Sequence, residues 1–443
     1  MIEREGGFRF SILKKVMCLS INICQQRQRM PFGNKLVLSL IVLSAFRPGI
    51  PYAFAGDAGV NPPRRDMPDG AVSAPGPLRI KEHIIKTADG WEISISRYII
   101  DTKGAEDPKA AVILCHGFNF NNLFWDLEKK VSLARYLARN GYDVWVPSLR
   151  GAGASSKPLI SDIRGIVRLD LKNLPREIVQ APSNVTKTNW TIDDHVLNDV
   201  PAIVNYVKKK SGFEKVYWIG HSMGGIIMFG YLERIAQDDI AGFIPVGSMV
   251  IIPSPLTGHL KRIADQEPLL RASLIINTRL AANLRTYSLG KIKYPIEEIL
   301  LKRENMDEGV IYRLFRNCIS DTSPGVVSQF STSIRTGSMI SSDKTYDYSA
   351  GIGRVSVPLL IMAGGADAFV DESILRRCYD LVSSADKSLI VCSKRTGYSA
   401  DYGHCDLLIG RNSRDEIYPV ILEWLDRRSM HKSLIDRLRE FFM

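Results

Sequence analysis

The most constraining feature of the chain is the hexapeptide Gly-His-Ser-Met-Gly-Gly at residues 220–225, directly after the apolar run Val216–Ile219. A Gly-x-Ser-x-Gly spacing after an apolar run is typical of a sharp turn from a strand into a helix, with the serine hydroxyl exposed at the turn. The flanking glycines let the two backbones approach without a Cβ clash. The motif therefore predicts a strand, a tight turn at Ser222 and a helix over Met223–Ile235.

Short apolar strands alternate with helices along most of the chain. Continuously apolar strands separated by helices imply a parallel sheet covered on both faces, which predicts an α/β fold. Before this alternation, residues 80–86 and 91–100 are rich in β-branched residues and flank a turn, which predicts a hairpin. The expected later strands are 110–114, 142–147, 215–219, 242–250, 357–362 and 388–392, and the expected helices are 123–140, 193–210, 223–235, 372–383 and 417–427.

The alternation stops between residues 253 and 353. That stretch contains helical patches at 269–284 and 296–303 and a polar connector at 331–348. We interpret 253–353 as an inserted cap or lid over the carboxyl ends of the strands, where open α/β sheets hold their ligands. An independent second domain is less favoured because expected strands flank the stretch on both sides. A smaller insertion at 154–190 is expected to line the entrance.

The N-terminal 55 residues resemble a targeting segment. They hold eight Lys and Arg against two Glu, and the apolar run Leu36–Phe46 leads to Ala-Phe-Ala at 53–55, a cleavage signal. The run is too short to span a bilayer. We expect a signal segment at 1–55, cleavage after Ala55 and a secreted or periplasmic protein. Met1 and Met30 are alternative start sites, and an uncleaved amphipathic anchor is the alternative to cleavage.

The segment boundaries then follow. Residues 56–77 are rich in Pro, Gly, Ala and Asp and predict a flexible leader. Residues 78–252 and 354–443 are expected to form the core around the cap at 253–353. The formal net charge is +11, of which the first 55 residues contribute eight minus two, or +6. The remaining +5 is too small and too dispersed to indicate nucleic-acid binding.

Seven cysteines include two within residues 1–55. The other five are an odd number, so at least one thiol stays free even if an exported protein forms disulfides, and the pairing is left open. Cys115 lies in an expected core strand and is predicted to be a small buried apolar residue. The spacings of Cys and His match no metal site, and we expect neither metal nor cofactor.

A serine hydroxyl becomes a useful nucleophile only beside a general base, which a carboxylate orients. In folds with this turn the order along the chain is serine, acid, histidine. His404 is the one histidine in a loop after the last expected strand, which predicts it as the base. Asp367, after the strand at 357–362, is the predicted acid. Asp371 is the alternative, although it also suits the N-cap of the helix beginning at Glu372.

Two backbone N–H groups are expected to stabilise the oxyanion. One belongs to Met223, directly after the nucleophile, and the other to Phe118 in the loop after the strand at 110–114. His116 and Gly117 support this loop, and Gly117 lets its backbone approach the substrate. His221 adjoins the serine, but neighbouring side chains on such a turn diverge, so we do not assign it to the base.

Several stretches resemble known proteins. Residues 141–151, 190–203 and 214–222, with Tyr-Gly-His-Cys-Asp-Leu at 402–407, are similar to the α/β-hydrolases and, more narrowly, to the acid lipases of the lysosomal and gastric group. The Met-Gly-Gly after Ser222 resembles bacterial serine esterases instead, and 253–353 matches neither. The resemblance implies an α/β-hydrolase fold, a triad of Ser222, Asp367 and His404, and no cofactor. It places Arg150 and Asp406 in structural roles.

The residues and the resemblance together favour hydrolysis of carboxylic esters, through an acyl-enzyme on Ser222. The expected substrate is a small-molecule or lipid ester, with transient contact to a lipid surface. Apolar residues at 269–280 suit an acyl or aromatic pocket, and equally suit helices that pack on a core. Acyl transfer, cleavage of carbon–carbon, peptide or thioester bonds, and non-catalytic binding on the same scaffold are the alternatives.

Overall fold

The computed structural model describes residues 76–101, 107–156, 189–251, 299–370 and 372–429. All of them belong to one of the two units into which the chain divides, Arg64–Met443. The expected signal segment 1–55, nearly all of the leader 56–77, and most of the smaller insertion 154–190 lie outside the described residues. So does the first half of the expected cap, with its helical patch at 269–284.

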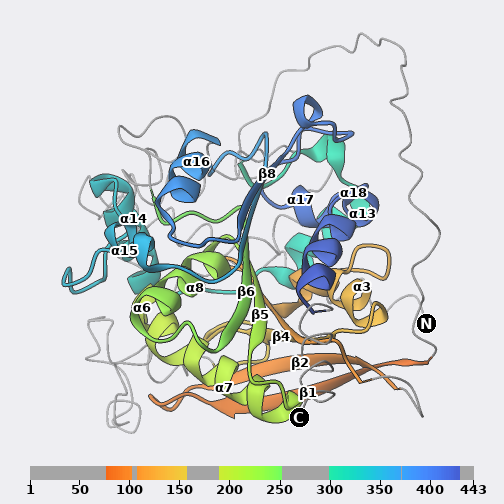
Figure 1. The fold of residues 1–443 in the computed structure, drawn as a ribbon, viewed down its shortest axis with the longest axis horizontal. Coiled ribbons are helices and arrows are strands. Elements are labelled where there is room, and N and C mark those ends of the chain that lie inside the picture. The colour runs from red at the N-terminus through yellow and green to blue at the C-terminus, as the bar shows by residue number, and fades with distance from the viewer. Residues whose placement is uncertain (1–75, 102–106, 157–188, 252–298, 371, 430–443) are drawn as a thin grey trace, which may run out of the picture. The chain divides into compact units, whose positions relative to one another are not determined.

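The described residues form a mostly parallel eight-stranded sheet, which confirms the predicted α/β class (Figure 1). The strand order is β1-β2-β4-β3-β5-β6-β7-β8. The β1–β2 and β2–β4 pairs are antiparallel, and every pair from β4 to β8 is parallel. The strands are β1 Leu78–Lys86, β2 Glu92–Ile100, β3 Ala111–Cys115, β4 Asp143–Ser148, β5 Val216–His221, β6 Ile240–Val246, β7 Leu359–Gly364 and β8 Lys387–Cys392.

The predicted N-terminal hairpin is confirmed as β1 and β2. Its turn is stabilised by Thr87, whose hydroxyl donates to Asp89 Oδ1 at 2.5 Å and accepts from the backbone N–H of Trp91 at 2.9 Å. Local side-chain bonds of this kind are what favour Thr and Asp in turns. The hairpin register runs from Leu78 opposite Ile100 to Lys86 opposite Glu92. It adds an antiparallel edge to the otherwise parallel sheet.

The central strands are buried on both faces, as their continuous apolar sequences predict. Successive side chains of a strand point to opposite faces. Ile113 and Trp218 therefore contribute to one apolar core, while Val112 and Tyr217 contribute to the other. The sheet is thus the middle layer of three.

Helices form the two outer layers. In Figure 1, α7 and α8 lie on one side of the sheet and α3 and α18 on the other. The helices are η1 Asn122–Asp126, α3 Leu133–Arg139, α6 Ile192–Asp194, η3 His195–Asp199, α7 Val200–Ser211, α8 Met223–Arg234, η4 Arg303–Asn305, α13 Glu308–Arg313, η5 Leu314–Cys318, α14 Pro324–Thr336, α15 Tyr348–Gly351, η6 Ile352–Arg354, α16 Glu372–Leu381, η7 Lys394–Thr396, α17 Asp406–Ile409, α18 Ser413–Glu416 and residues 418–429.

Two expectations about local structure were wrong. The helix expected over 123–140 is divided into η1 and α3, because Ser132 has extended backbone and its hydroxyl accepts from the N–H of Arg135 at 3.0 Å. Such a cap starts a new helix rather than continuing an old one. The connector expected from residue 331 begins later, because α14 continues to Thr336 and ends at Gly337, whose φ of 71° is left-handed.

The described part of the expected cap, residues 299–353, packs on both cores. Ile311 and Leu314 join the core that contains α3, whereas Val326 and Tyr348 join the core that contains α8. This stretch is therefore firmly attached to the sheet layers. Its function as a cap remains a prediction.

The five cysteines of the described residues are all free and buried: Cys115, Cys318, Cys378, Cys392 and Cys405. Burial raises the pKa of each thiol, to about 12 for Cys378 and Cys392. Within the same residues, none of the helices is both long and apolar enough to cross a bilayer.

Candidate active site

The predicted site residues follow different strands of the sheet but share one edge. Ser222 follows β5, Gly117 follows β3, Asp367 follows β7 and His404 lies beyond β8. Because these strands are parallel, their carboxyl ends meet at the same edge, where α/β sheets hold their ligands. Asp371, the alternative acid, lies outside the described residues.

Ser222 occupies a strained turn. Its φ of 52° and ψ of −120° are unusual for a residue with a side chain. Such a conformation costs about 1–3 kcal/mol and is typical of functional turns. The Ser222 N–H donates to the carbonyl of Val246 at 2.9 Å, and α8 begins at the next residue, Met223. The serine is thereby held between the end of β5 and the start of a helix, with its side chain partly exposed.

His404 and Asp367 form a buried pair. The Nδ1 atom of His404 lies 2.8 Å from Asp367 Oδ2, and the two side chains are 4% and 0% exposed. The other carboxylate oxygen of Asp367 accepts from the N–H groups of Phe369 at 2.8 Å and Val370 at 3.2 Å. A carboxylate only accepts, so Nδ1 carries the proton and Nε2 is the basic nitrogen.

The serine turn and the His404–Asp367 pair share contacts. Gly247 follows the Val246 carbonyl that holds Ser222, and a Cβ placed on Gly247 would lie 3.1 Å from Asp367 Oδ2 and 3.2 Å from His404 Nδ1. From the serine side, His221 Nε2 donates to the carbonyl of His404 at 3.1 Å. The structure therefore brings the three predicted residues of the triad to one place.

The loop expected to supply an oxyanion donor lies directly against the serine. A Cβ on Gly117 would stand only 2.9 Å from the Cβ of Ser222 and 3.0 Å from His221 Nδ1. Only glycine therefore fits where the loop crosses the turn. Phe118 is the next residue of this loop. Met223 is the first residue of α8, so its N–H has no acceptor within the helix.

His116 is buried and structural. Its Nδ1 donates to the carbonyl of Gly117 at 2.9 Å, and its Nε2 accepts from the N–H of Leu149 at 3.0 Å. Burial lowers the pKa of His116 to about 4, so the ring stays neutral. It ties the Gly117 loop to the end of β4, and its supporting role in catalysis stays a prediction.

A buried ionic cluster lies beside this loop. Arg150 donates two bonds to Asp199 and two to Asp89, and His195 Nδ1 lies 2.7 Å from Asp199 Oδ2. Burial alone would raise the pKa of Asp199, but the His195 bond and the Arg150 charge outweigh it and lower the pKa. The structural role expected for Arg150 agrees with these contacts. The sequence interpretation missed His195, although its spacing of four residues from Asp199 on a helix was visible.

Asp406 also has structural contacts. Its carboxylate accepts from the backbone N–H groups of Gly403 at 2.8 Å and Lys302 at 2.9 Å, and from Asn305 Nδ2 at 2.7 Å. These bonds fix the loop that carries His404. They also attach that loop to residues 302–305, in the second half of the expected cap.

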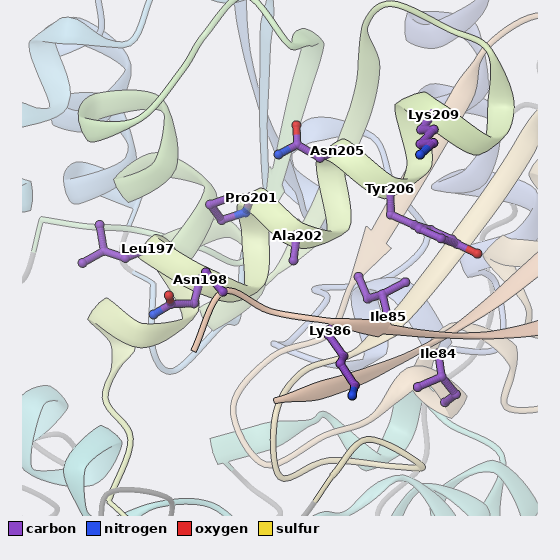
Figure 2. Close-up of a pocket in the computed structure, with 11 residues that line it drawn as sticks. Ile84, Ile85, Lys86, Leu197, Asn198, Pro201, Ala202, Asn205, Tyr206 and Lys209 are labelled. Carbon is purple, nitrogen blue, oxygen red and sulfur yellow. The ribbon is translucent and has the colours of Figure 1, made fainter. Parts of the chain in front are cut away.

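One small cavity adjoins the site, and a larger groove lies elsewhere among the described residues. The small cavity, of about 10 Å³, lies beside Gly117 and Met223 and reaches Asn119 and His195. It has room for about one water molecule. The larger groove, of about 550 Å³, lies between β1 and α7, with Lys86 and Lys209 at its rim (Figure 2). None of the predicted site residues lines that groove.

We find no group of three or more His, Cys, Asp or Glu side chains in metal-binding arrangement among the residues that the structure describes. Asp367, Asp199 and Asp406 are instead bonded to protein donors. This edge of the sheet carries the Ser222 hydroxyl, the His404 imidazole and the Asp367 carboxylate.

Known proteins resemble the chain in sequence and fold. It is 24% identical over 382 residues to a probable lipase of Schizosaccharomyces pombe, covering 80% of this chain and 79% of that protein. It is 28% identical over 193 residues to the human lysosomal acid lipase/cholesteryl ester hydrolase, covering 42% and 43%. In fold it resembles a thermophilic esterase from Thermogutta terrifontis, with a TM-score of 0.50 and 16% identity over 79% of this chain and 99% of that one.

The model of the family described as serine aminopeptidase, S33, matches residues 106–395, which is more than half of the chain. That range begins just before β3 and extends beyond β8, and it contains Ser222 and Asp367. Together with the sheet order, this match shows that the chain is an α/β-hydrolase and belongs to the serine aminopeptidase, S33, family.

Proposed function

We propose that the protein is a serine hydrolase of carboxylic esters, with Ser222 as nucleophile, His404 as general base and Asp367 as the acid that orients it. The observation that carries the proposal is the buried His404–Asp367 pair, 2.8 Å apart, at the sheet edge where Ser222 occupies its strained turn. Nucleophile, base and orienting group are the set that acyl transfer from an ester requires.

The reaction proceeds in two halves. Ser222 Oγ attacks the ester carbonyl while His404 Nε2 takes its proton, and Asp367 stabilises the imidazolium. The N–H groups of Phe118 and Met223 hold the oxyanion, each contributing about 3 kcal/mol to transition-state binding. The alcohol leaves with the proton from His404. Water, deprotonated by the same imidazole, then hydrolyses the acyl-enzyme to a carboxylate and free Ser222.

An ester with an apolar acyl group suits the surroundings of the site. The ring of Phe369 lies 4.7 Å from the His404 ring, and Phe118 of the oxyanion loop meets Phe330 of α14 at 5.5 Å. All three aromatic side chains are only partly buried. The related proteins named as lipases support lipid esters as the substrate class.

The test measures hydrolysis of p-nitrophenyl esters, from acetyl to palmitoyl, by the purified protein and by three variants. S222A is expected to lower kcat by about 10⁴- to 10⁶-fold. D367N should lower it by about 10³- to 10⁴-fold because the imidazole loses its orienting carboxylate. D371N is the matched control and should retain wild-type kcat. A near wild-type rate for S222A, or a larger loss in D371N than in D367N, contradicts the assignment.

Two further assays separate the alternatives. Aminoacyl p-nitroanilides report peptide cleavage, and added acceptor alcohols report acyl transfer, each measured beside the esters. A fluorophosphonate probe should label the wild-type protein and not S222A. Absence of labelling in the wild-type protein favours a non-catalytic binding role.

We also propose that the protein is exported, on the basis of the segment at 1–55. Mass spectrometry of the protein recovered from the medium or periplasm should find Gly56 as the first residue. An N-terminus upstream of Lys35 in the exported protein excludes this cleavage.

A further inference from the structure

His221 lies at the junction of three loops that meet at the site. Its ring is fully buried and stacks on Phe124 of η1 at 4.6 Å. It also lies 4.7 Å from the ring of His404 and contacts the position of Gly117, whose Cβ would be 3.0 Å from His221 Nδ1.

The hydrogen bonds of His221 define its tautomer. The carbonyl of His404 can only accept, so His221 Nε2, 3.1 Å away, carries the proton. Its Nδ1 therefore has a free lone pair, and that atom is buried with no hydrogen-bond partner among the described residues. Burial, together with the nearby His404, lowers the pKa of His221 well below its ordinary value. The ring is thus a neutral donor with one fixed orientation.

We propose that His221 is a positioning residue for His404, and that its Nε2–H bond to the His404 carbonyl sets the distance between base and nucleophile. This inference rests on the proposed function. The Asp367 bond holds the imidazole of His404, and the Asp406 bonds fix the main chain of its loop to residues 302–305, but neither set of bonds reaches the residue before Ser222. The His221 bond also holds that main chain, and its donor belongs to the residue directly before Ser222.

The arrangement joins two segments that are 183 residues apart in the chain. A displacement of about 1 Å between reacting groups costs roughly 10²-fold in rate, so a single bond that fixes this spacing has a measurable effect on kcat. The bond does not contact substrate, so KM should change little when it is lost. A role in stability alone would lower the fraction of active enzyme but not the kcat of each active site, so kcat is expressed per Ser222 labelled at completion by the fluorophosphonate probe.

The experiment compares H221Q, H221N and H221L with the wild-type protein on one p-nitrophenyl ester and with the fluorophosphonate probe. The amide nitrogen of Gln reaches about as far as His Nε2, whereas that of Asn is one methylene shorter. We expect H221N and H221L to lose about 10- to 100-fold in kcat and in the rate of labelling, with KM within about threefold. H221Q should recover most of that loss.

The comparison of H221Q with H221N tests the bond even if H221L folds poorly, because these two variants differ by a single methylene. H83Q is the matched control. His83 Nδ1 lies 2.9 Å from the Tyr206 hydroxyl, and neither residue belongs to the predicted site. The kcat of H83Q should equal that of the wild-type protein. Equal kcat in H221Q and H221N overturns the inference, as does wild-type kcat in H221L. If S222A retains activity, the proposed function itself is wrong; if only the His221 variants disagree, the triad stands.

Discussion

At the scale of residues, the proposed site consists of three side chains that follow different strands of one sheet. Ser222 was predicted from its flanking glycines, and Asp367 and His404 from their order after strands, and all three stay predictions as catalytic residues. The structure places all three at one sheet edge. The partner of His221 could not be predicted, because it is a carbonyl 183 residues away, whereas the spacing of four residues between His195 and Asp199 was visible and was missed.

Gly117 gives the first prediction at this scale. Its Cα lies so close to the serine turn that an added methyl group would stand 2.9 Å from the Ser222 Cβ. G117A should push the loop away and displace the Phe118 N–H from the oxyanion. Losing one such donor lowers kcat by about 10²- to 10³-fold, so we expect that loss with a small change in KM, measured on a p-nitrophenyl ester.

G309A is the control for this experiment. Gly309 lies in α13, where the nearest atom to an added Cβ is 3.8 Å away. Its substitution should leave kcat unchanged. An unimpaired G117A enzyme would show that the loop does not supply the oxyanion donor.

At the scale of elements, the positions of the central strands along the chain were predictable because their apolar runs are continuous. The helix boundaries were less so, since a single hydroxyl at Ser132 divided the expected helix at 123–140. The attachment of 299–353 was also beyond prediction. Besides apolar packing on both cores, it includes the bonds of Gln329 and Asp193, buried polar residues that an apolar period does not reveal.

Gln329 bridges α14 and α6. Its Oε1 accepts from the N–H of Ile192 at 2.8 Å, and its Nε2 donates to the carbonyl of Ile340 at 3.0 Å and to Asp193 at 3.2 Å. Q329L would remove the Gln329 partner of the Ile192 N–H and of the Ile340 carbonyl, at about 1–3 kcal/mol each, whereas Asp193 keeps its bonds from Tyr348 and Ser342. We expect the free energy of unfolding to fall by about 3 kcal/mol, measured by urea denaturation.

The matched control is Q237L. Gln237 also bonds backbone groups, at Arg354 and Ser356, but on the exposed surface where water replaces the lost bonds. Its effect should stay below about 1 kcal/mol. Similar losses in both variants would mean that 299–353 is held by apolar packing rather than by the Gln329 bridge.

At the scale of the whole molecule, the fold class followed from the alternation of strands and helices, but the strand order did not. The sequence of β4 does not indicate that this strand lies between β2 and β3. That order results from crossover connections and from packing on both faces, which depend on residues far apart in the chain. The response of stability to pH is likewise a property of the assembled molecule.

Glu233 in α8 provides the prediction at this scale. It is 7% exposed, it accepts from the Tyr346 hydroxyl at 3.2 Å, and burial raises its pKa from 4.5 to about 8. Between these two values the folded protein retains a proton that the unfolded chain has released, so stability falls as pH rises through the window. E233Q should flatten this fall, by up to about 1.4 kcal/mol per pH unit, in urea denaturation from pH 5 to 8.

E423Q is the control, because Glu423 is exposed and pairs with Arg427. Its pH dependence should match that of the wild-type protein. If the pH profile of E233Q runs parallel to that of the wild-type protein, burial does not raise the pKa of Glu233 as expected.

The buried thiols have a practical consequence. They are distributed from β3 to the loop before α17, and each is both inaccessible and held in its protonated form. Since the thiolate is the reactive species, alkylating agents meet these sulfurs only when the surrounding structure opens. Timed alkylation followed by peptide mapping would therefore show, at these five cysteines, which layer of the molecule unfolds first.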